Sequence, residues 1–241
     1  MKKEILGVIG GLGPIATAHF MELVINMTQA NSDQENVEMI IYNFPSIPDR
    51  TEYILGKSDE SPLPEMLRIG RSLASQGVSL IAIPCVTAHY FYREIAQGIS
   101  APVVNGIAET VALLKARGIQ KVGIMATDGT IRTGILSKEL SFAGIETVVP
   151  SGERQQDVMH LIYQNVKAGK RAEMDRFCRV RQELTEQGAQ VILLGCTELS
   201  LIKRDEEIGP GFLDIMEVLA QQSVLRCGKT LRKEYEDLIT G

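Results

Sequence analysis

Two segments of the chain repeat each other, and this repetition constrains the fold more than any other feature. Residues 71–85 (RSLASQGVSLIAIPC) align without gaps on residues 182–196 (QELTEQGAQVILLGC), at an offset of 111. Residues 7–17 (GVIGGLGPIAT) align on residues 123–133 (GIMATDGTIRT), at an offset of 116. Two nearly equal offsets in the same order predict a duplicated structural unit.

Short apolar runs alternate with helix-like segments along the whole chain. The expected strands lie at 5–11, 37–44, 78–85, 101–107, 121–127, 146–150 and 190–196. The expected helices lie at 15–30, 63–76, 88–98, 107–117, 131–143, 154–168, 171–187 and about 215–236. This alternation predicts an α/β fold with mostly parallel sheets.

The repeat and the alternation together predict two similar lobes, each a mostly parallel sheet flanked by helices. The expected first lobe comprises residues 1–103 plus 212–241, with the C-terminal helix packing back on it. The expected second lobe comprises residues 104–211. A chain of 241 residues is long enough for two small domains.

Charge and composition exclude several classes of partner. The chain has 25 basic and 30 acidic residues, with a net charge of -5 and no block of like charge, so we expect neither nucleic acid nor a membrane surface as a partner. No apolar run approaches the roughly 20 residues of a membrane helix. Four cysteines in a chain of this length do not suggest a disulfide framework, and we expect a cytoplasmic protein.

Each half ends a strand in a cysteine and then begins a helix, in IPC-VTAHYF for Cys85 and LGC-TELSLI for Cys196. Ligands of open parallel sheets bind beyond the carboxyl ends of the strands, so both thiols point toward expected ligand sites. A single cysteine is more often core packing, but the repetition favours a function. A helix N-terminus stabilises the thiolate, which predicts a lowered pKa for both thiols.

A symmetric pair of thiols suits inversion at an α-carbon. Such a reaction removes a proton from one face and delivers another to the opposite face, and the reverse reaction exchanges the two roles. A hydrolase would instead need one nucleophile and a different residue as its base. If the lobes face each other, Cys85 and Cys196 would lie across one cleft.

The remaining sulfur and imidazole groups have simpler interpretations. Cys178 and Cys227 have no repeat partner, and we expect both to pack within helical segments. His89 follows Cys85 by four residues and could form a Cys/His pair or half of a metal site. Because the second half has no matching histidine, a capping or packing role is favoured, and no metal site is expected.

Three further features have two interpretations each. The turn GGLGP (10–14) lacks the spacing of nucleotide-binding loops and is either a carboxylate-binding turn or a plain turn. Its repeat counterpart supplies the hydroxyl groups of Thr127 and Thr130. Arg50, in the proline-rich PSIPDRTEY, and Lys167, in NVKAGK, could bind a carboxylate or lie in solvent.

The segments GGLGPIAT, PDRT, PCVTAH, VKAG and LGCTEL resemble, in order and spacing, the aspartate/glutamate racemase family, and its aspartate racemase branch most. The resemblance covers essentially the whole chain. It implies two lobes related by a pseudo-two-fold axis with the active site between them, a homodimer, an amino-acid substrate and no cofactor. It implies Cys85 and Cys196 as the proton-transferring pair. It also implies a set of substrate-binding residues: Arg50, Thr87, Thr127, Lys167, Thr197 and Glu198.

Several details bear on the substrate. Glu198 stands where glutamate racemases carry histidine, which favours aspartate over glutamate. Val86 and Phe44 stand where the aspartate racemases tend to carry asparagine. Losing an amide contact to the substrate carboxylate costs about 1–3 kcal/mol. We therefore expect weak racemisation of aspartate, or a preference for a less polar amino acid.

Two alternatives to a racemase stay open. One is another isomerase of the same superfamily, of the maleate isomerase type; the two retained cysteines argue against a decarboxylase, which needs one proton donor. The other alternative is a protein that binds an acidic amino acid without converting it.

Overall fold

The computed structural model describes residues 4–241, which divide into two compact units. The first unit extends to Gly106 and also contains Met216–Leu238. The second unit contains Ile107–Ile215 and Ile239–Gly241. The chain therefore leaves the first unit directly after Gly106.

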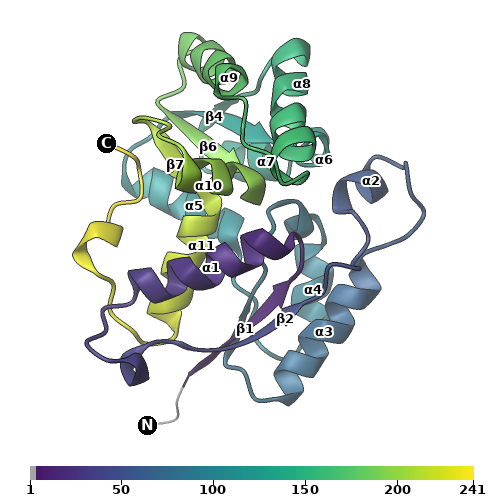
Figure 1. Ribbon diagram of the computed structural model, residues 1–241, viewed down its shortest axis with the longest axis vertical. Helices are drawn as coiled ribbons and strands as arrows, with labels where there is room; N and C mark the ends of the chain where they lie inside the picture. Colours follow the sequence, from purple (N-terminus) through teal and green to yellow (C-terminus); the bar gives the residue numbers. More distant parts are fainter. Residues whose placement is uncertain (1–3) are drawn as a thin grey trace. The chain divides into compact units, whose positions relative to one another are not determined.

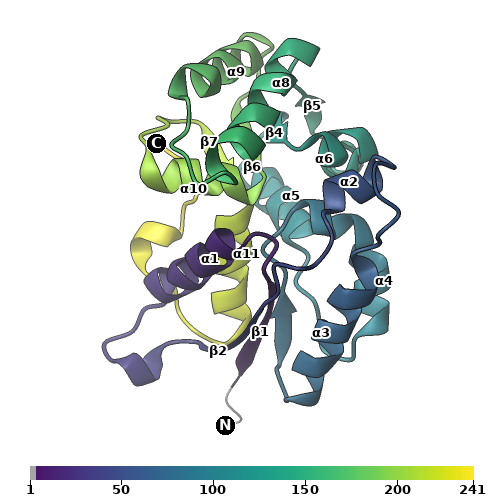
Figure 2. The same cartoon turned by 45° about the vertical axis from the view of Figure 1, so that its right-hand side comes forward.

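The first unit is built on a three-stranded parallel sheet in the order β2 (Glu38–Asn43), β1 (Ile5–Gly10), β3 (Leu80–Ala82). An isolated bridge from Ile81 to Val103 extends its β3 edge. In both views α3 and α4 lie on one side of this sheet and α1 and α11 on the other (Figures 1 and 2). The helices are α1 (Pro14–Met27), α2 (Arg50–Ile54), α3 (Leu63–Ser75), α4 (Tyr92–Gly98) and α11 (Ile215–Arg226).

Helix α3 shows why these residues form this layer. Its apolar side chains recur with helical spacing, so Met66, Ile69 and Leu73 share one face and are fully buried against the sheet. Gly70 lies on the same face, where a Cβ atom would come within 2.0 Å of Ile99. The buried side chains of this layer form one apolar cluster that also includes Cys85.

The second unit is built on a four-stranded parallel sheet. Its order is β5 (Glu146–Val148), β4 (Lys121–Ala126), β6 (Val191–Gly195), β7 (Phe212–Asp214). Helices α8 and α9 pack on β4. The helices are α5 (Gly106–Ala116), α6 (Asp128–Thr133), α7 (Ile135–Phe142), α8 (Gly152–His160), α9 (Met174–Glu186) and α10 (Thr197–Asp205).

The sequence repeat corresponds to equivalent strands of the two sheets. In each sheet the strand that carries the first repeated motif, β1 or β4, is an inner strand, and the strand that leads to the cysteine motif, β3 or β6, lies beside it. Gly7 and Gly123 also match: a Cβ atom at either position would lie 3.1 Å from a packed side chain, Val78 or Leu184. The predicted fold class, two α/β lobes with parallel sheets, is confirmed.

Several expected elements differ in the structure. Residues 101–107 form a single bridge rather than a strand, because only Val103 pairs with Ile81. The helix expected at 131–143 is divided at Gly134, whose φ of 65° interrupts the helix. The helix expected at 154–168 becomes a π-helix at Leu161–Val166. The C-terminal helix ends at Arg226, ten residues early, and Gly228 follows with a φ of 70°.

The borders of the units also differ from the expected lobes, 1–103 plus 212–241 and 104–211. Strand β7 was not expected, and its pairing with β6 assigns Phe212–Asp214 to the second unit. The last residues return to the same sheet, because Thr240 accepts the N–H of Gly211 and its hydroxyl accepts the N–H of Phe212.

Two features are absent from residues 4–241. None of the helices there is long and apolar enough to cross a membrane. Among the same residues, no three His, Cys, Asp or Glu side chains are grouped so as to hold a metal ion.

Candidate active site

Cys85 lies just beyond the carboxyl end of β3, in a short turn in which its N–H donates to the carbonyl of Ile83 at 2.7 Å. The side chain is buried, with 7% of its surface exposed. The expected α-helix does not begin here: a 3-10 helix, Thr87–Phe91, comes first, and α4 follows it. Thr87 is buried at the start of this turn.

His89 contacts the backbone rather than the thiol. Its Nδ1 lies 3.0 Å from the carbonyl oxygen of Cys85, and its Nε2 accepts the N–H of Gly106 at 3.1 Å. Burial lowers the pKa of His89, which favours the neutral ring. Both nitrogens have backbone partners, so the alternative of a Cys/His nucleophilic pair is not supported, and the favoured capping role is confirmed.

Arg50 lies at the same edge of the first sheet as Cys85. It is the first residue of α2, whose N-cap is Asp49, and its side chain is buried. The guanidinium donates to the carbonyl of Leu12 at 3.2 Å and to that of Pro48 at 3.0 Å. Because Leu12 follows β1 and the carboxyl ends of parallel strands share one edge, this cation and the Cys85 thiol belong to one end of the unit.

The GGLGP turn after β1 is held by internal contacts. Gly11 has a φ of 91°, and a Cβ atom there would lie 2.3 Å from the backbone of Phe44. The N–H of Gly11 donates to Oγ1 of Thr17 at 2.9 Å, so this amide is used by the turn itself. This contact favours the plain-turn interpretation at Gly11.

The ring of Phe44 lies against a residue of α3 and against Tyr42. It lies 5.0 Å below the guanidinium carbon of Arg68 on α3, and its centroid is 6.2 Å from that of Tyr42. Tyr42 bonds Ser72 on the same helix, so both rings cover the α3 face of the sheet. Val86, the residue after Cys85, is also buried.

Cys196 is the N-cap residue of α10, directly after β6, and 7% of its surface is exposed. Its Sγ donates to Oε2 of Glu198 at 2.8 Å. Thr197 donates to the same oxygen at 3.3 Å. Burial and the charge of Glu198 raise the pKa of Cys196 well above its usual value, and Lys167 lowers it less. The pKa expected from the helix N-terminus alone was therefore wrong in direction for this thiol.

Lys167 reaches this carboxylate from the end of the π-helix. Its Nζ lies 3.8 Å from Oε1 of Glu198 and 4.7 Å from the centroid of the Tyr163 ring. The N–H of Lys167 bonds the carbonyl of Ile162, five residues back. The buried Asn165 anchors the segment through two bonds to Glu173. π-helical turns are uncommon and often occur at functional sites.

Thr127 follows β4 and lies at the same edge of the second sheet as Cys196. It is the N-cap of α6, and its hydroxyl accepts the N–H of Thr130 at 3.3 Å. The two threonine hydroxyl groups lie 3.2 Å apart, and both residues are buried.

The sequence of residues 9–223 matches the family model described as Asp/Glu/Hydantoin racemase. The chain belongs to this family. The match spans most of both units and includes Cys85 and Cys196, so the residues discussed above all lie inside the family region. The enzyme is accordingly an isomerase of the amino-acid racemase type.

Relatives of this racemase cover nearly its whole length. The broad specificity amino-acid racemase RacX of Bacillus subtilis is 28% identical over 224 residues, which are 91% of this chain and 96% of the relative. A solved aspartate racemase of Picrophilus torridus is 33% identical with a TM-score of 0.86, covering 97% and 98% of the two chains. An aspartate racemase homologue of Pyrococcus horikoshii, 22% identical, shares the fold with a TM-score of 0.75 and coverage of 95% and 100%.

The structure groups the predicted site residues of this racemase by unit. Cys85, Arg50 and Thr87 belong to the first unit, and five belong to the second: Thr127, Lys167, Cys196, Thr197 and Glu198. Sequence reasoning missed Tyr163 and the contact of Glu198 with the thiol. Tyr163 lies four residues before Lys167 in a helical segment, and this spacing is a signal that could have indicated the contact between their side chains.

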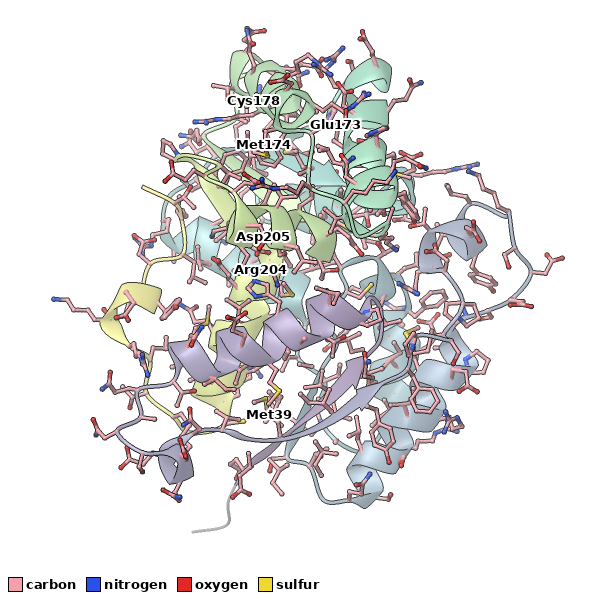
Figure 3. All side chains as sticks on the ribbon, in the orientation of Figure 1. Met39, Glu173, Met174, Cys178, Arg204 and Asp205 are labelled. Carbon is pink, nitrogen blue, oxygen red and sulfur yellow. The ribbon has the colours of Figure 1, made fainter. Side chains whose placement is uncertain are left out.

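The structure confirms the prediction for one of the two remaining cysteines and contradicts it for the other. Cys227 is buried, as expected, and burial raises its pKa to about 11. Cys178 is exposed on α9, so the expectation that it packs in the core was wrong. Figure 3 shows it on the same helix as Met174, and both residues line an open pocket that also includes Arg204 and Asp205.

Proposed function

We propose that this protein is a cofactor-independent amino-acid racemase that uses Cys85 and Cys196 as a two-base pair. The observation that carries the proposal is the equivalence of the two thiols. Each follows the strand that pairs with the first-motif strand of its own parallel sheet, β3 next to β1 and β6 next to β4. A chain of this family with two equivalent thiols suits inversion at an α-carbon.

In the proposed reaction one cysteine acts as thiolate and the other as thiol. The thiolate takes the α-proton and becomes a thiol, and the electron pair of the broken C–H bond stays on the substrate as a carbanion. The opposite thiol then delivers its proton to the other face and becomes a thiolate. No atom is gained or lost, and the reverse reaction exchanges the two roles. The mechanism requires the two sulfurs to exchange protons with opposite faces of one α-carbon.

Glu198 has a specific role in this proposal. It accepts the S–H of Cys196 at 2.8 Å, which stabilises the protonated thiol in the resting protein. Its charge and the burial of the sulfur both raise the pKa of Cys196. We assign Glu198 to control of this proton rather than to direct substrate binding, with Lys167 at 3.8 Å as its cationic partner.

Carboxylate binding is assigned to cations and hydroxyl groups at the two sheet edges. Arg50 is buried and fixed by backbone carbonyls, which suits a planar fork for a carboxylate. Lys167 carries a second positive charge, and three buried hydroxyl groups accompany the thiols: Thr87, Thr127 and Thr197. Two cationic groups match an amino acid with two carboxylates.

Aspartate is the proposed first substrate, because the solved relative at 33% identity is named an aspartate racemase. The name of the Bacillus subtilis relative favours a second possibility, a wider range of amino acids. Val86 supports that breadth, because a valine side chain provides no amide for a substrate carboxylate.

The decisive experiment incubates the purified protein with L-aspartate in deuterated water. NMR follows loss of the α-proton signal, and chiral chromatography follows formation of D-aspartate. We expect deuterium incorporation together with D-aspartate. Glutamate, alanine and methionine form the comparison panel for substrate breadth.

Thermal unfolding with each amino acid, and incubation with maleate, separate the alternatives. A binding protein would show ligand-dependent thermal stabilisation with no exchange at the α-carbon of any amino acid in the panel. An isomerase of the maleate type would convert maleate without exchanging amino acids. Either result would contradict the proposed racemisation.

The proposal includes two further properties, independence of a cofactor and assembly as a homodimer, and each has a direct test. The enzyme should retain its exchange rate after treatment with a chelator and with a reagent that traps pyridoxal phosphate. The proposed homodimer should have twice the 26.5 kDa mass of one chain when measured by light scattering.

A further inference from the structure

His89 joins two backbone positions that the proposed mechanism makes important. One is the carbonyl of Cys85, 3.0 Å from Nδ1. The other is the N–H of Gly106, 3.1 Å from Nε2. Gly106 is the first residue of α5 and the last residue of the first unit before the chain enters the second.

The two hydrogen bonds fix the state of the ring. A backbone N–H can only donate, so Nε2 must accept and carries no proton. The one proton of the neutral ring is then on Nδ1, where it donates to the carbonyl of Cys85. Burial of His89 lowers its pKa and supports the same neutral form.

The surrounding residues hold the ring in place. The Tyr92 ring stacks on it at 6.2 Å between centroids, with the two planes 5° apart, and the Tyr92 hydroxyl donates to the carbonyl of Val103. The segment that leads to Gly106 is paired with β3, because Ile81 bonds both Pro102 and Val104. Strand β3 also leads to Cys85, so the His89 ring closes a loop that begins and ends on this strand.

We propose that His89 is a positioning residue for Cys85, which fixes the backbone of the reacting thiol to the point at which the chain leaves the first unit. The inference rests on the proposed function, in which Cys85 exchanges a proton with the substrate. Proton transfer demands accurate placement, and a displacement of about 1 Å can cost about 100-fold in rate. His89 supplies no proton and touches no substrate in this role.

The test uses proteins in which only one thiol remains to act as base. In the Cys196→Ala protein only Cys85 can take the α-proton, so solvent exchange should be confined to one enantiomer of aspartate. In the Cys85→Ala protein exchange should be confined to the other enantiomer. The change His89→Gln is added to each protein, and exchange of L- and D-aspartate is measured in deuterated water.

We expect His89→Gln to slow the Cys85-dependent exchange by about 10- to 100-fold through kcat, with a smaller change in KM. The Cys196-dependent exchange should change by less than about twofold, because the two hydrogen bonds of His89 go to Cys85 and Gly106. An equal loss in both proteins would mean a general structural role and would overturn the inference.

A matched control is available in the second unit. His160→Gln changes a histidine whose Nε2 lies 2.7 Å from the carboxylate of Glu173, and it should leave both exchange rates within about twofold. Thermal unfolding of each protein checks that the fold is retained. His89→Asn serves as the second variant if His89→Gln does not fold.

Two outcomes need separate treatment. If the protein with both cysteines exchanges none of the amino acids in the panel, the proposed function fails and this inference fails with it. If that protein is active but the single-thiol proteins are not, the α-deuterium isotope effect is measured with both thiols present. His89→Gln should then raise the isotope effect for one enantiomer only, and an equal rise for both would overturn the inference.

Nitrogen NMR of the unmodified protein tests the geometry without catalysis. The chain has three histidines, so the His89 signals can be assigned by substitution. We expect a protonated Nδ1 and an unprotonated Nε2. A ring with the proton on Nε2 cannot accept the N–H of Gly106 at that nitrogen, and it would contradict the proposed link between Cys85 and Gly106.

Discussion

At the residue scale, the two thiols differ although the repeat makes their positions equivalent. Cys196 donates to a carboxylate two residues away. Cys85 is followed by Val86, which carries no ionisable group, and its neighbour His89 contacts the carbonyl rather than the sulfur. The repeat therefore preserves the location of each sulfur but not the groups that control its proton.

Replacing Glu198 by glutamine tests control of the Cys196 proton. The change removes a negative charge next to the sulfur, so the pKa of Cys196 should fall toward its usual value. Alkylation of Cys196, followed by mass spectrometry across pH, should then reach half-maximal rate at a lower pH. Racemisation should fall by about 10- to 100-fold. An unchanged alkylation profile would contradict the assigned role, and Glu186→Gln, on exposed α9 surface, is the control.

Replacing Val86 by asparagine tests the basis of substrate choice. An added amide that bonds the substrate carboxylate should raise kcat/KM for aspartate by about 5- to 150-fold. Val86→Ala supplies no donor and should give no such gain. Efficient use of aspartate by the original protein, with no improvement in Val86→Asn, would show that the valine is not a deficit.

At the element scale, one buried carboxylate joins α8 to α9. Asp157 on α8 is buried and accepts from Arg176 at 2.6 Å and from Arg179 at 3.3 Å, both on α9, while Arg154 approaches it on its own helix. Burial alone would raise the pKa of Asp157, but the bonds and charges of these arginines outweigh it and leave the pKa lowered.

Asp157→Asn should therefore reduce stability, by about 1–3 kcal/mol after allowing for the partial exposure of the arginines. The pKa of Asp157 is lower in the folded than in the unfolded state. Its contribution is thus present above the unfolded pKa of about 3.9 and is lost as the pH falls through the folded pKa. Urea unfolding at neutral and acidic pH should show the difference between the two proteins shrinking in acid. Glu186→Gln, on the exposed surface of α9, is the control.

The turn that follows β1 provides a second test at this scale. Gly11 combines a φ of 91° with a Cβ position 2.3 Å from the Phe44 backbone, so Gly11→Ala requires the turn to move. We expect a loss of about 1–3 kcal/mol, measured by urea unfolding. Gly152→Ala has open space at its Cβ and no positive φ, and it should be neutral or slightly stabilising.

At the scale of the whole molecule, each unit has its own parallel sheet and contains one of the two thiols of the proposed pair. The proposed function therefore needs both halves of the chain. Cys85→Ala and Cys196→Ala should each abolish racemisation while thermal unfolding stays close to that of the original protein. Chiral chromatography measures racemisation, and a normal rate in either variant would show that the two-base model is wrong.

The internal repeat predicted much of the fold because it reports on strands. The aligned segments share glycines and apolar residues at packed positions. Gly7 and Gly123 each lie against a packed side chain, Val78 or Leu184, and such requirements can be read from neighbouring residues. The prediction of one continuous helix over 131–143 was wrong because of a single residue. Gly134 lies inside an apolar pattern typical of one helix, and only its positive φ divides the segment.

The sequence by itself determined the two α/β units, the equivalent strands and the position of each cysteine at a strand end. These features follow from the periods of strands and helices, which depend on residues close together in the chain. Only the tertiary structure decided that Phe44 packs on Arg68, that Glu198 accepts the Cys196 thiol and that His89 reaches Gly106. Those outcomes depend on side-chain direction and on partners brought together by folding, and neither composition nor spacing encodes them.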